Sequence, residues 1–402
     1  MLPSLLKAAD GYDTTPASST PVTPAPETPP TGSAVSAPVL QNTTGDGITV
    51  VWAVNGSCTG WVEYGETNTL GQTAYGSVDG LKPFDDKAIK VRVTGLKPGT
   101  TYFYRAITCP FEIKYDKPIS GTAVPGITYQ FKTLDPAAAA TSFSLITTNS
   151  SLINDPHESQ DTMTHLVSMI QAQPTDSLIW NGDIFNSVTS EQKIAEQILN
   201  PIGRGVAYAA TLPLIWVRGN HQGYGLSARF LKKYCDVPNN HWYYTLRQGP
   251  VAFVVLDTGD AGTPDKSQPL NDFTQYISVQ QEWLRSAIEE PEFRNASFRV
   301  VLLHIPLAWA TYDAGSPGKE GNAKWRDLFV KAKIDLIISG DVHNPAWVAP
   351  GVGTPYGQLT GGGQDPTLAT LIRGKADQKT MNISMCGIDG KELFSHTFNR
   401  QT

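Results

Sequence analysis

The stretch Ile337-Ile338-Ser339-Gly340-Asp341-Val342-His343-Asn344 decides how the rest of the chain is interpreted. An apolar run typical of a buried strand ends at Gly340 and is followed by two side chains that can bind a metal, Asp341 and His343. In strand-like backbone, residues two apart point to the same side. The spacing therefore predicts that both side chains face one site.

Three earlier apolar runs also end in polar residues. They are Trp180-Asn181-Gly182-Asp183, Val217-Arg218-Gly219-Asn220-His221 and Leu302-Leu303-His304-Ile305-Pro306. In α/β sheets, ligands bind beyond the carboxyl ends of the strands. We therefore expect all four ends to converge on one metal-dependent active site.

Length and composition favour a globular protein of two domains. The chain has 402 residues, of which 40% are hydrophobic and 17% charged, and its net charge is -6. The acidic balance argues against a nucleic-acid partner, and no apolar run is long enough for a membrane span.

Residues 1–37 are predicted to be a disordered tether, because Thr, Pro, Ser and Ala dominate from Thr14 to Pro38. Met1 to Asp13 lacks the basic region and apolar core of a signal peptide. We expect an extracytoplasmic (periplasmic or secreted) protein whose export signal is absent from this sequence. The alternative is a disordered cytosolic tail.

Four cysteines are present, and none forms a CxxC pair. Cys58 and Cys109 fall in the same N-terminal module. A disulfide between them in an oxidising compartment and two buried free thiols are both consistent with the sequence.

Residues 38–134 are all-β in character. Short β-rich runs separated by turn residues predict a sandwich. The runs are 47–52, 59–65, 90–93 and 101–105, with a Gly-Leu-Lys-Pro-Gly-Thr turn at 95–100. The region resembles the fibronectin type III domain that precedes the catalytic domain of purple acid phosphatases, which implies a scaffold or surface-binding role.

Residues 141–402, after a linker, alternate between strand and helix patterns, which predicts an α/β core in layers with helices outside. The predicted strands are 143–147, 178–180, 214–217, 251–256, 300–303 and 334–338, and the predicted helices are 159–171, 191–199, 279–289 and 324–332. A Gly-Gly-Gly run at 361–363 fits either an ordinary turn or a loop close to the site.

The four motifs, in this order, resemble the calcineurin-like metallophosphoesterase superfamily, and purple acid phosphatases in particular. The motifs of that family are an opening Asp, then GD, GNH, an isolated His and GHxH. The resemblance covers about residues 141–398. It implies a layered α/β metallophosphoesterase-type sandwich, preceded here by the all-β fibronectin type III-like sandwich.

Three positions depart from the family pattern. Thr148 stands where the opening Asp is expected, Asn186 stands where purple acid phosphatases have a Tyr, and Asp341 replaces the first His of GHxH. Of the ligands to one family metal, only Asp183 and His343 then remain.

The other family metal keeps a complete set of capable ligands, Asp183, Asn220, His304 and Asp341. Oxygen and nitrogen donors of this kind suit zinc, manganese or iron. We therefore predict one divalent transition metal. Rescue of the second site by Asn149, Asp155 or His157 is the alternative.

Four further residues are candidates for catalysis. In the family the position of His221 serves proton transfer or transition-state stabilisation. His343 is expected to contact substrate or move protons. Arg218 either holds an anionic group of the substrate or forms a structural ion pair, and His157 either lines the pocket or lies on a surface loop.

The predicted function is a metal-dependent hydrolase of phosphoester-like substrates, acting on a small-molecule or carbohydrate-type anion. Two alternatives stay open, because a fold does not determine its chemistry. One is a metal-dependent lyase of a uronic-acid-containing polysaccharide. The other is a non-catalytic binding protein.

Overall fold

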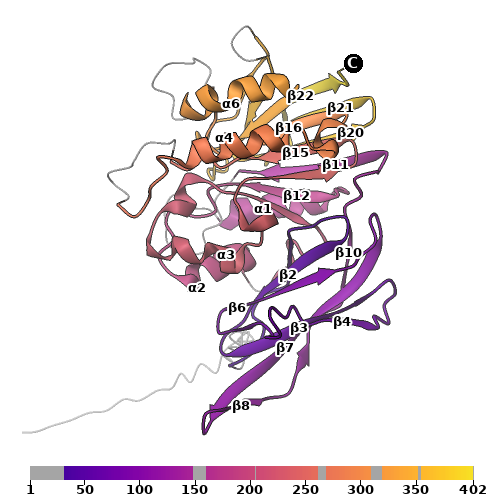
Figure 1. Ribbon diagram of the computed structural model, residues 1–402, viewed down its shortest axis with the longest axis vertical. Helices are drawn as coiled ribbons and strands as arrows, with labels where there is room; N and C mark the ends of the chain where they lie inside the picture. The colour runs from indigo at the N-terminus through magenta and orange to yellow at the C-terminus, as the bar shows by residue number, and fades with distance from the viewer. Residues whose placement is uncertain are drawn as a thin grey trace, which may run out of the picture.

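A computed structural model describes residues 31–147, 160–203, 205–260, 269–308, 319–351 and 355–401. Its N-terminal part is a β-sandwich, and the remainder is a layered α/β domain (Figure 1). None of the described helices has the length and apolar character needed to cross a membrane.

The N-terminal sandwich contains all four predicted runs as strands. Its strands are β1 (Val39–Gln41), β2 (Gly47–Ala53), β3 (Cys58–Gly65), β4 (Gln72–Ala74), β5 (Phe84–Asp85), β6 (Ala88–Thr94), β7 (Thr101–Lys114), β8 (Lys117–Ser120), β9 (Val124–Pro125) and β10 (Tyr129–Lys132). One face follows the order β10-β7-β3-β4, and the other is β1-β2-β6. Trp52 and Tyr104 are buried between them, as expected for a sandwich core.

The α/β domain has two sheets. The first sheet begins with β6, β2 and β1 of the sandwich. From β1 it continues in the order β13 (Leu214–Val217), β12 (Ser177–Asn181), β11 (Ala140–Ile146), β20 (Thr370–Asp377), β21 (Thr380–Gly387) and β22 (Glu392–Asn399). The second follows the order β14 (Tyr244–Gln248), β15 (Val251–Val255), β16 (Phe298–Leu302), β17 (Leu336–Ser339), β19 (Gly357–Thr360), β18 (Ala346–Val348). Strands β12 and β13 are parallel, and so are β16 and β17, so each pair ends at one edge of its sheet.

Helices and helical turns connect these strands. They are α1 (Gln160–Gln171), α2 (Glu191–Ile194), η1 (Ala195–Leu199), η2 (Asn220–Gly223), η3 (Leu226–Phe230), α3 (Leu231–Tyr234), η4 (Pro238–Asn240), α4 (Tyr276–Ala287), α5 (Pro291–Arg294) and α6 (Lys319–Lys331). In α1, Met163, Leu166, Val167 and Ile170 recur at helical spacing and are all buried. Helices α4 and α6 pack on the outer face of the second sheet (Figure 1).

Aromatic rings fill the core between the sheets. The rings of Phe143 and Phe253, one from each sheet, meet edge to face with centroids 5.2 Å apart. Trp180 and Trp216 stack on neighbouring strands at 5.7 Å. Buried pairs of this kind hold the strand ends in fixed positions.

The sandwich and the α/β domain share one sheet. Strand β1 pairs in parallel with β13 through Gln41 and Leu214. Beside this pairing, the carboxylate of Asp236 accepts hydrogen bonds from the side chains of Asn42 (2.8 Å), Thr49 (2.6 Å) and Lys90 (3.3 Å). The two parts are therefore joined by polar contacts that need a correctly docked sandwich.

The structure has free thiols at Cys58 and Cys109. In the β3–β7 ladder Cys58 lies opposite Pro110, and Cys109 lies opposite Thr59. Residues directly opposite share a face, so the two cysteines point to opposite faces of their sheet. A disulfide would require the strands to change register.

Replacing Asp236 by Ala should loosen the joint between the two parts. Burial raises the pKa of Asp236, but the hydrogen bond from Thr49 and the charge of Lys90 lower it below its ordinary value. The carboxylate therefore stabilises the fold above about pH 4, and this contribution is lost as the pH falls through the lower folded pKa. We expect Asp236→Ala to reduce the free energy of unfolding by about 2–3 kcal/mol near neutral pH, measured in urea.

The matched control is Asp327→Ala, on the exposed side of α6. It should change the unfolding free energy by less than about 0.5 kcal/mol. Equal stability of the Asp236 variant and the wild type would contradict the proposed importance of this joint.

Candidate metal centre

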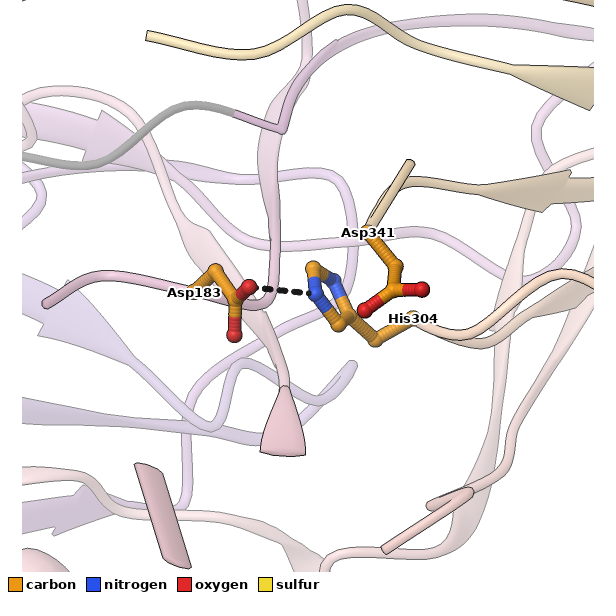
Figure 2. Close-up of side chains that lie close together, drawn as sticks. All are labelled: Asp183, His304 and Asp341. Atoms are coloured by element: carbon orange, nitrogen blue, oxygen red, sulfur yellow. Dashed lines mark ion pairs between the residues drawn. The ribbon is translucent and has the colours of Figure 1, made fainter. Parts of the chain in front are cut away.

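Strand ends from both sheets meet at one point. Asp183 follows β12, His304 follows β16 and Asp341 follows β17. One ligand atom from each lies within 4.8 Å of the others. Figure 2 shows the imidazole of His304 between the two carboxylates. The structure thus brings together three of the four predicted ligands in one cluster.

Glycines make this close approach of backbone segments feasible. A Cβ atom on Gly182 would lie 2.1 Å from His304 Nδ1, and one on Gly219 would lie 2.4 Å from Asp183 Oδ1. A Cβ on Gly340 would lie 3.2 Å from the His304 ring. Each glycine precedes a polar motif residue, so the Gly in these motifs provides space for the neighbouring ligand.

Three site residues have left-handed backbone. The φ angles are 46° for Asp183, 67° for Asp341 and 57° for His343. Such angles are uncommon outside glycine and are costly unless the surroundings enforce them. Their concentration at one place indicates that backbone strain is accepted here to aim the side chains.

His304 is fully buried and has two contacts. Its Nδ1 lies 2.9 Å from the backbone carbonyl of Asn181, and its Nε2 lies 3.0 Å from Asp183 Oδ2. Because a carbonyl only accepts, Nδ1 carries a proton and Nε2 faces the cluster. Burial lowers the pKa of His304, but the carboxylates of Asp183 and Asp341 outweigh it and raise the pKa to about 9.

The two carboxylates respond differently to their surroundings. Burial raises the pKa of Asp183, but His304 and His221 outweigh this effect, so the net pKa lies below its ordinary value. For Asp341, burial together with the charge of Asp183 outweighs the histidines and raises the pKa. A cation in the cluster would relieve this repulsion between carboxylates.

Asn220 has the property expected of an amide ligand. Its buried Oδ1 has no hydrogen-bond partner within the described residues. Its Nδ2 donates to the hydroxyl of Tyr224 (3.2 Å), which in turn donates to Asp260 Oδ1 (3.0 Å). Tyr224 therefore determines which end of the amide remains available. Two carboxylates, an imidazole and an amide oxygen are donor types that fit a divalent transition metal, so the unpaired Oδ1 is consistent with the predicted role of Asn220 as a fourth ligand.

Three supporting residues were not singled out by the sequence analysis. Asn181 donates from Nδ2 to the carbonyl of Ile338 (3.2 Å) and so connects the two sheets. Gln222 Oε1 accepts the backbone N–H groups of both Asp183 (2.9 Å) and Gly219 (2.7 Å). Tyr224 orients Asn220. A polar residue at the end of an apolar run, and a Gln two residues after Asn220, were the available signals.

His221 lies beside the cluster with an exposed edge. Its Nδ1 lies 2.8 Å from the backbone carbonyl of Asn186, and its Nε2 lies 3.9 Å from Asp183 Oδ2. The side chain is 32% exposed. Asn186 thus holds the His221 ring through its backbone carbonyl.

Arg218 and His343 lie at the border of the cluster. Arg218 forms an ion pair, as one of the two predicted roles expected. Its Nη2 lies 2.5 Å from Oδ2 of the fully buried Asp257. His343 is half-buried and lies against Gly363, where a Cβ would approach the His343 Cβ to 2.7 Å. The Gly-Gly-Gly run therefore lies at the site, as the second of the two interpretations expected.

Several predicted positions lie outside the described residues. They are Thr148, Asn149, Asp155 and His157. Residues 1–30 of the predicted tether lie outside them as well.

Comparison with known proteins agrees with this geometry. The family model described as "Calcineurin-like phosphoesterase" matches residues 152–345, which include all four predicted ligands. Residues 152–345 are thus similar to calcineurin-like phosphoesterases. Purple acid phosphatase 1 of Ipomoea batatas is 27% identical to it over 158 residues, which are 35% of this chain and 29% of that protein. The chain thus matches less than a third of this curated relative.

Solved structures share the fold of this chain over most of its length. Purple acid phosphatase PPD1 from yellow lupin (Lupinus luteus) seeds superposes with a TM-score of 0.67 and 17% identity, covering 92% of this chain and 75% of that one. PhoD superposes with a TM-score of 0.63 and 12% identity, covering 93% and 90%. These likenesses include the N-terminal region, which fits a fibronectin type III-like domain. The expected fold is therefore confirmed.

Removing the Tyr224 hydroxyl should weaken metal binding without unfolding the protein. In Tyr224→Phe the Asn220 amide loses the contact that orients it, so it can rotate away. Loss of such an outer contact typically costs 10- to 100-fold in metal affinity. We expect about a tenfold rise in the zinc dissociation constant, measured with a competing chelator dye. Tyr115→Phe, in an exposed turn, is the matched control and should bind zinc as the wild type does.

Metal binding should release a proton from His304. The imidazole is protonated below about pH 9 in the metal-free protein, and only neutral imidazole binds a metal. Affinity should therefore rise about tenfold per pH unit up to that value. Calorimetry near neutral pH, in buffers of different ionisation enthalpy, should give about one proton released per metal. Release of no proton would contradict the assignment of His304 as a ligand.

Proposed function

We propose that the protein is a metal-dependent hydrolase of phosphoester-like substrates that uses one divalent transition metal. Asp183, Asn220, His304 and Asp341 would hold the metal. The observation that carries the proposal is the largely buried cluster of two carboxylates and an imidazole, together with the Asn220 amide oxygen, which has no hydrogen-bond partner within the described residues. The family of the domain supports the reaction class.

The bound metal would polarise an oxygen of the anionic substrate and lower the pKa of water. The protein would keep this centre dry on one side, because His304 and Asp183 are 0% and 3% exposed. A low local dielectric strengthens the attraction between substrate charge and site.

His221 is the best placed residue for proton transfer. The Asn186 carbonyl holds the proton on Nδ1, so Nε2 is the atom that accepts or donates a proton on the side of the cluster. Its partial exposure gives it access to substrate and solvent. We propose His343, also half-buried, as a second contact to the substrate.

The proposal of a single metal rests on the departures at Thr148, Asn186 and Asp341. Of the ligands that the family uses for a second metal, only Asp183 and His343 remain in this sequence. The backbone carbonyl of Asn186 already contacts His221, which supports its role as an orienting residue.

We also propose that the protein works outside the cytoplasm. The support is the Thr-, Pro- and Ser-rich composition of residues 14–38, which suits an extended tether on an exported protein. Cell fractionation of the native source tests this placement directly.

Asp183→Ala should abolish both metal binding and hydrolysis. The purified wild type should contain about one transition metal per chain, measured by mass spectrometry, and should hydrolyse aryl phosphates. Loss of the metal removes several kcal/mol of transition-state stabilisation, so turnover should fall about a thousandfold. The control Asp327→Ala, on an exposed face of α6, should keep both properties.

Two other results would overturn the proposal. Bound metal without phosphatase turnover, but with unsaturated products from a uronic-acid polymer, would identify the lyase. Neither metal nor turnover would identify a binding protein.

A further inference from the structure

A pocket of about 430 Å³ lies beside the candidate metal centre. It lies between the loop that follows β13, the start of β14 and the start of α4. Gln222 forms part of its wall and also accepts the backbone N–H groups of Asp183 and Gly219. One side chain therefore contacts the backbone of the metal centre and lines the pocket.

Two buried hydrogen-bond donors of the pocket wall have no partner. Gln222 Nε2 and Asn271 Nδ2 are buried, and within the described residues neither donates to any acceptor. Gln222 itself is only 2% exposed. A buried unsatisfied donor costs about 1–3 kcal/mol, so a ligand that supplies acceptors would relieve the cost.

The charge of the pocket is positive, although the whole chain carries a net charge of -6. Arg218, Arg229 and Lys232 line it, and Asp272 is the one acidic residue of the lining. Asp257 neutralises Arg218 from behind, and Asp272 accepts the backbone N–H of Thr274 at 3.0 Å. Burial lowers the pKa of Lys232 and the charge of Arg218 lowers it further, whereas Asp257 raises it.

Arg218 is held rigidly at the inner end of this pocket. Its guanidinium carbon lies 5.6–5.7 Å from the ring centroids of Trp242, Phe273 and Tyr276. The ion pair with Asp257 fixes one edge of its planar fork. A guanidinium oriented in this way is suited to bidentate contacts with an oxyanion.

We propose that this pocket is an oxyanion subsite, which binds a phosphate, sulfate or carboxylate group on the non-reacting part of the substrate. Its donors, excess positive charge and rigid guanidinium all favour an acceptor-rich anion, and its volume suits a body of about one sugar ring. The identification of this ligand as part of the substrate rests on the proposed function. The binding of an oxyanion by the pocket is independent of that function.

The test is calorimetric titration of the full chain after its metal has been stripped with a chelator and the chelator dialysed away, so that neither the metal nor a polyanionic chelator contributes. The probes are glucose 6-phosphate, glucuronate and inorganic sulfate, with neutral glucose for comparison. We expect at least one anion to bind more tightly than glucose, and added salt to weaken it. The tightest probe identifies which oxyanion the subsite prefers.

Two variants assign the binding to this pocket. Asn271→Leu removes a donor that has no protein partner, so the fold should be unaffected. Lys232→Gln removes one charge. Each should weaken anion binding about tenfold. Lys331→Gln is the control and should bind as the wild type does, because Lys331 lies at the end of α6 in an exposed ion pair with Glu289.

The subsite is overturned if no anion binds more tightly than glucose, or if both variants bind as tightly as the wild type. Thermal melts show whether either variant is misfolded. Anion binding without hydrolysis in the metal-loaded protein would overturn the proposed function alone. Hydrolysis without binding in the metal-stripped protein would overturn this subsite alone.

Discussion

A histidine without solvent exposure joins the two sheets of the α/β domain. His304 follows the second sheet, yet its two ring nitrogens contact Asn181 and Asp183 of the first. Asn181 in turn donates to the backbone of Ile338. The missing side chain of Gly182 makes room for the ring. The strand ends therefore cannot slide without leaving buried polar groups unpaired, which is costly in the interior.

The same constraint explains the electrostatics of the centre. Two buried carboxylates near each other are unstable unless a positive charge lies between them. In the protein alone, the proton on His304 supplies that charge, and a divalent cation would supply it in its place. Asp341 adds a second carboxylate to the cluster, and this added negative charge favours a bound cation.

The side chain of Gln222 contacts both the candidate metal centre and the pocket beside it. Its carbonyl oxygen fixes the backbone that presents Asp183 and precedes Asn220, where the surroundings are acidic. The same side chain lines a pocket with excess positive charge, and its amide nitrogen has no hydrogen-bond partner within the described residues. A substrate with a reacting phosphoryl group and a second anionic group would contact both the metal centre and the pocket. This arrangement also gives Arg218 a consistent role, since its ion pair and aromatic neighbours hold it in place for a ligand.

The sequence by itself determined the order of strands and helices and the types of the candidate ligands. Apolar runs that end in polar motifs are local patterns, and the structure has a strand at each predicted run. The strands β20, β21 and β22 were not predicted, although Met381, Ile383 and Met385 alternate inward as expected for a half-buried strand. Hence the parallel core was predictable, whereas its antiparallel edge was not recognised.

Only the tertiary structure decided which side chains support the predicted ligands and how those ligands are oriented. The roles of Asn181, Gln222 and Tyr224 depend on hydrogen bonds between segments far apart in the chain, as in the contact of Asn181 with Ile338. The separation of Cys58 and Cys109 likewise depends on the register of β3 against β7. Motif spacing carries no information about such contacts, because each is fixed by how two sheets pack and pair.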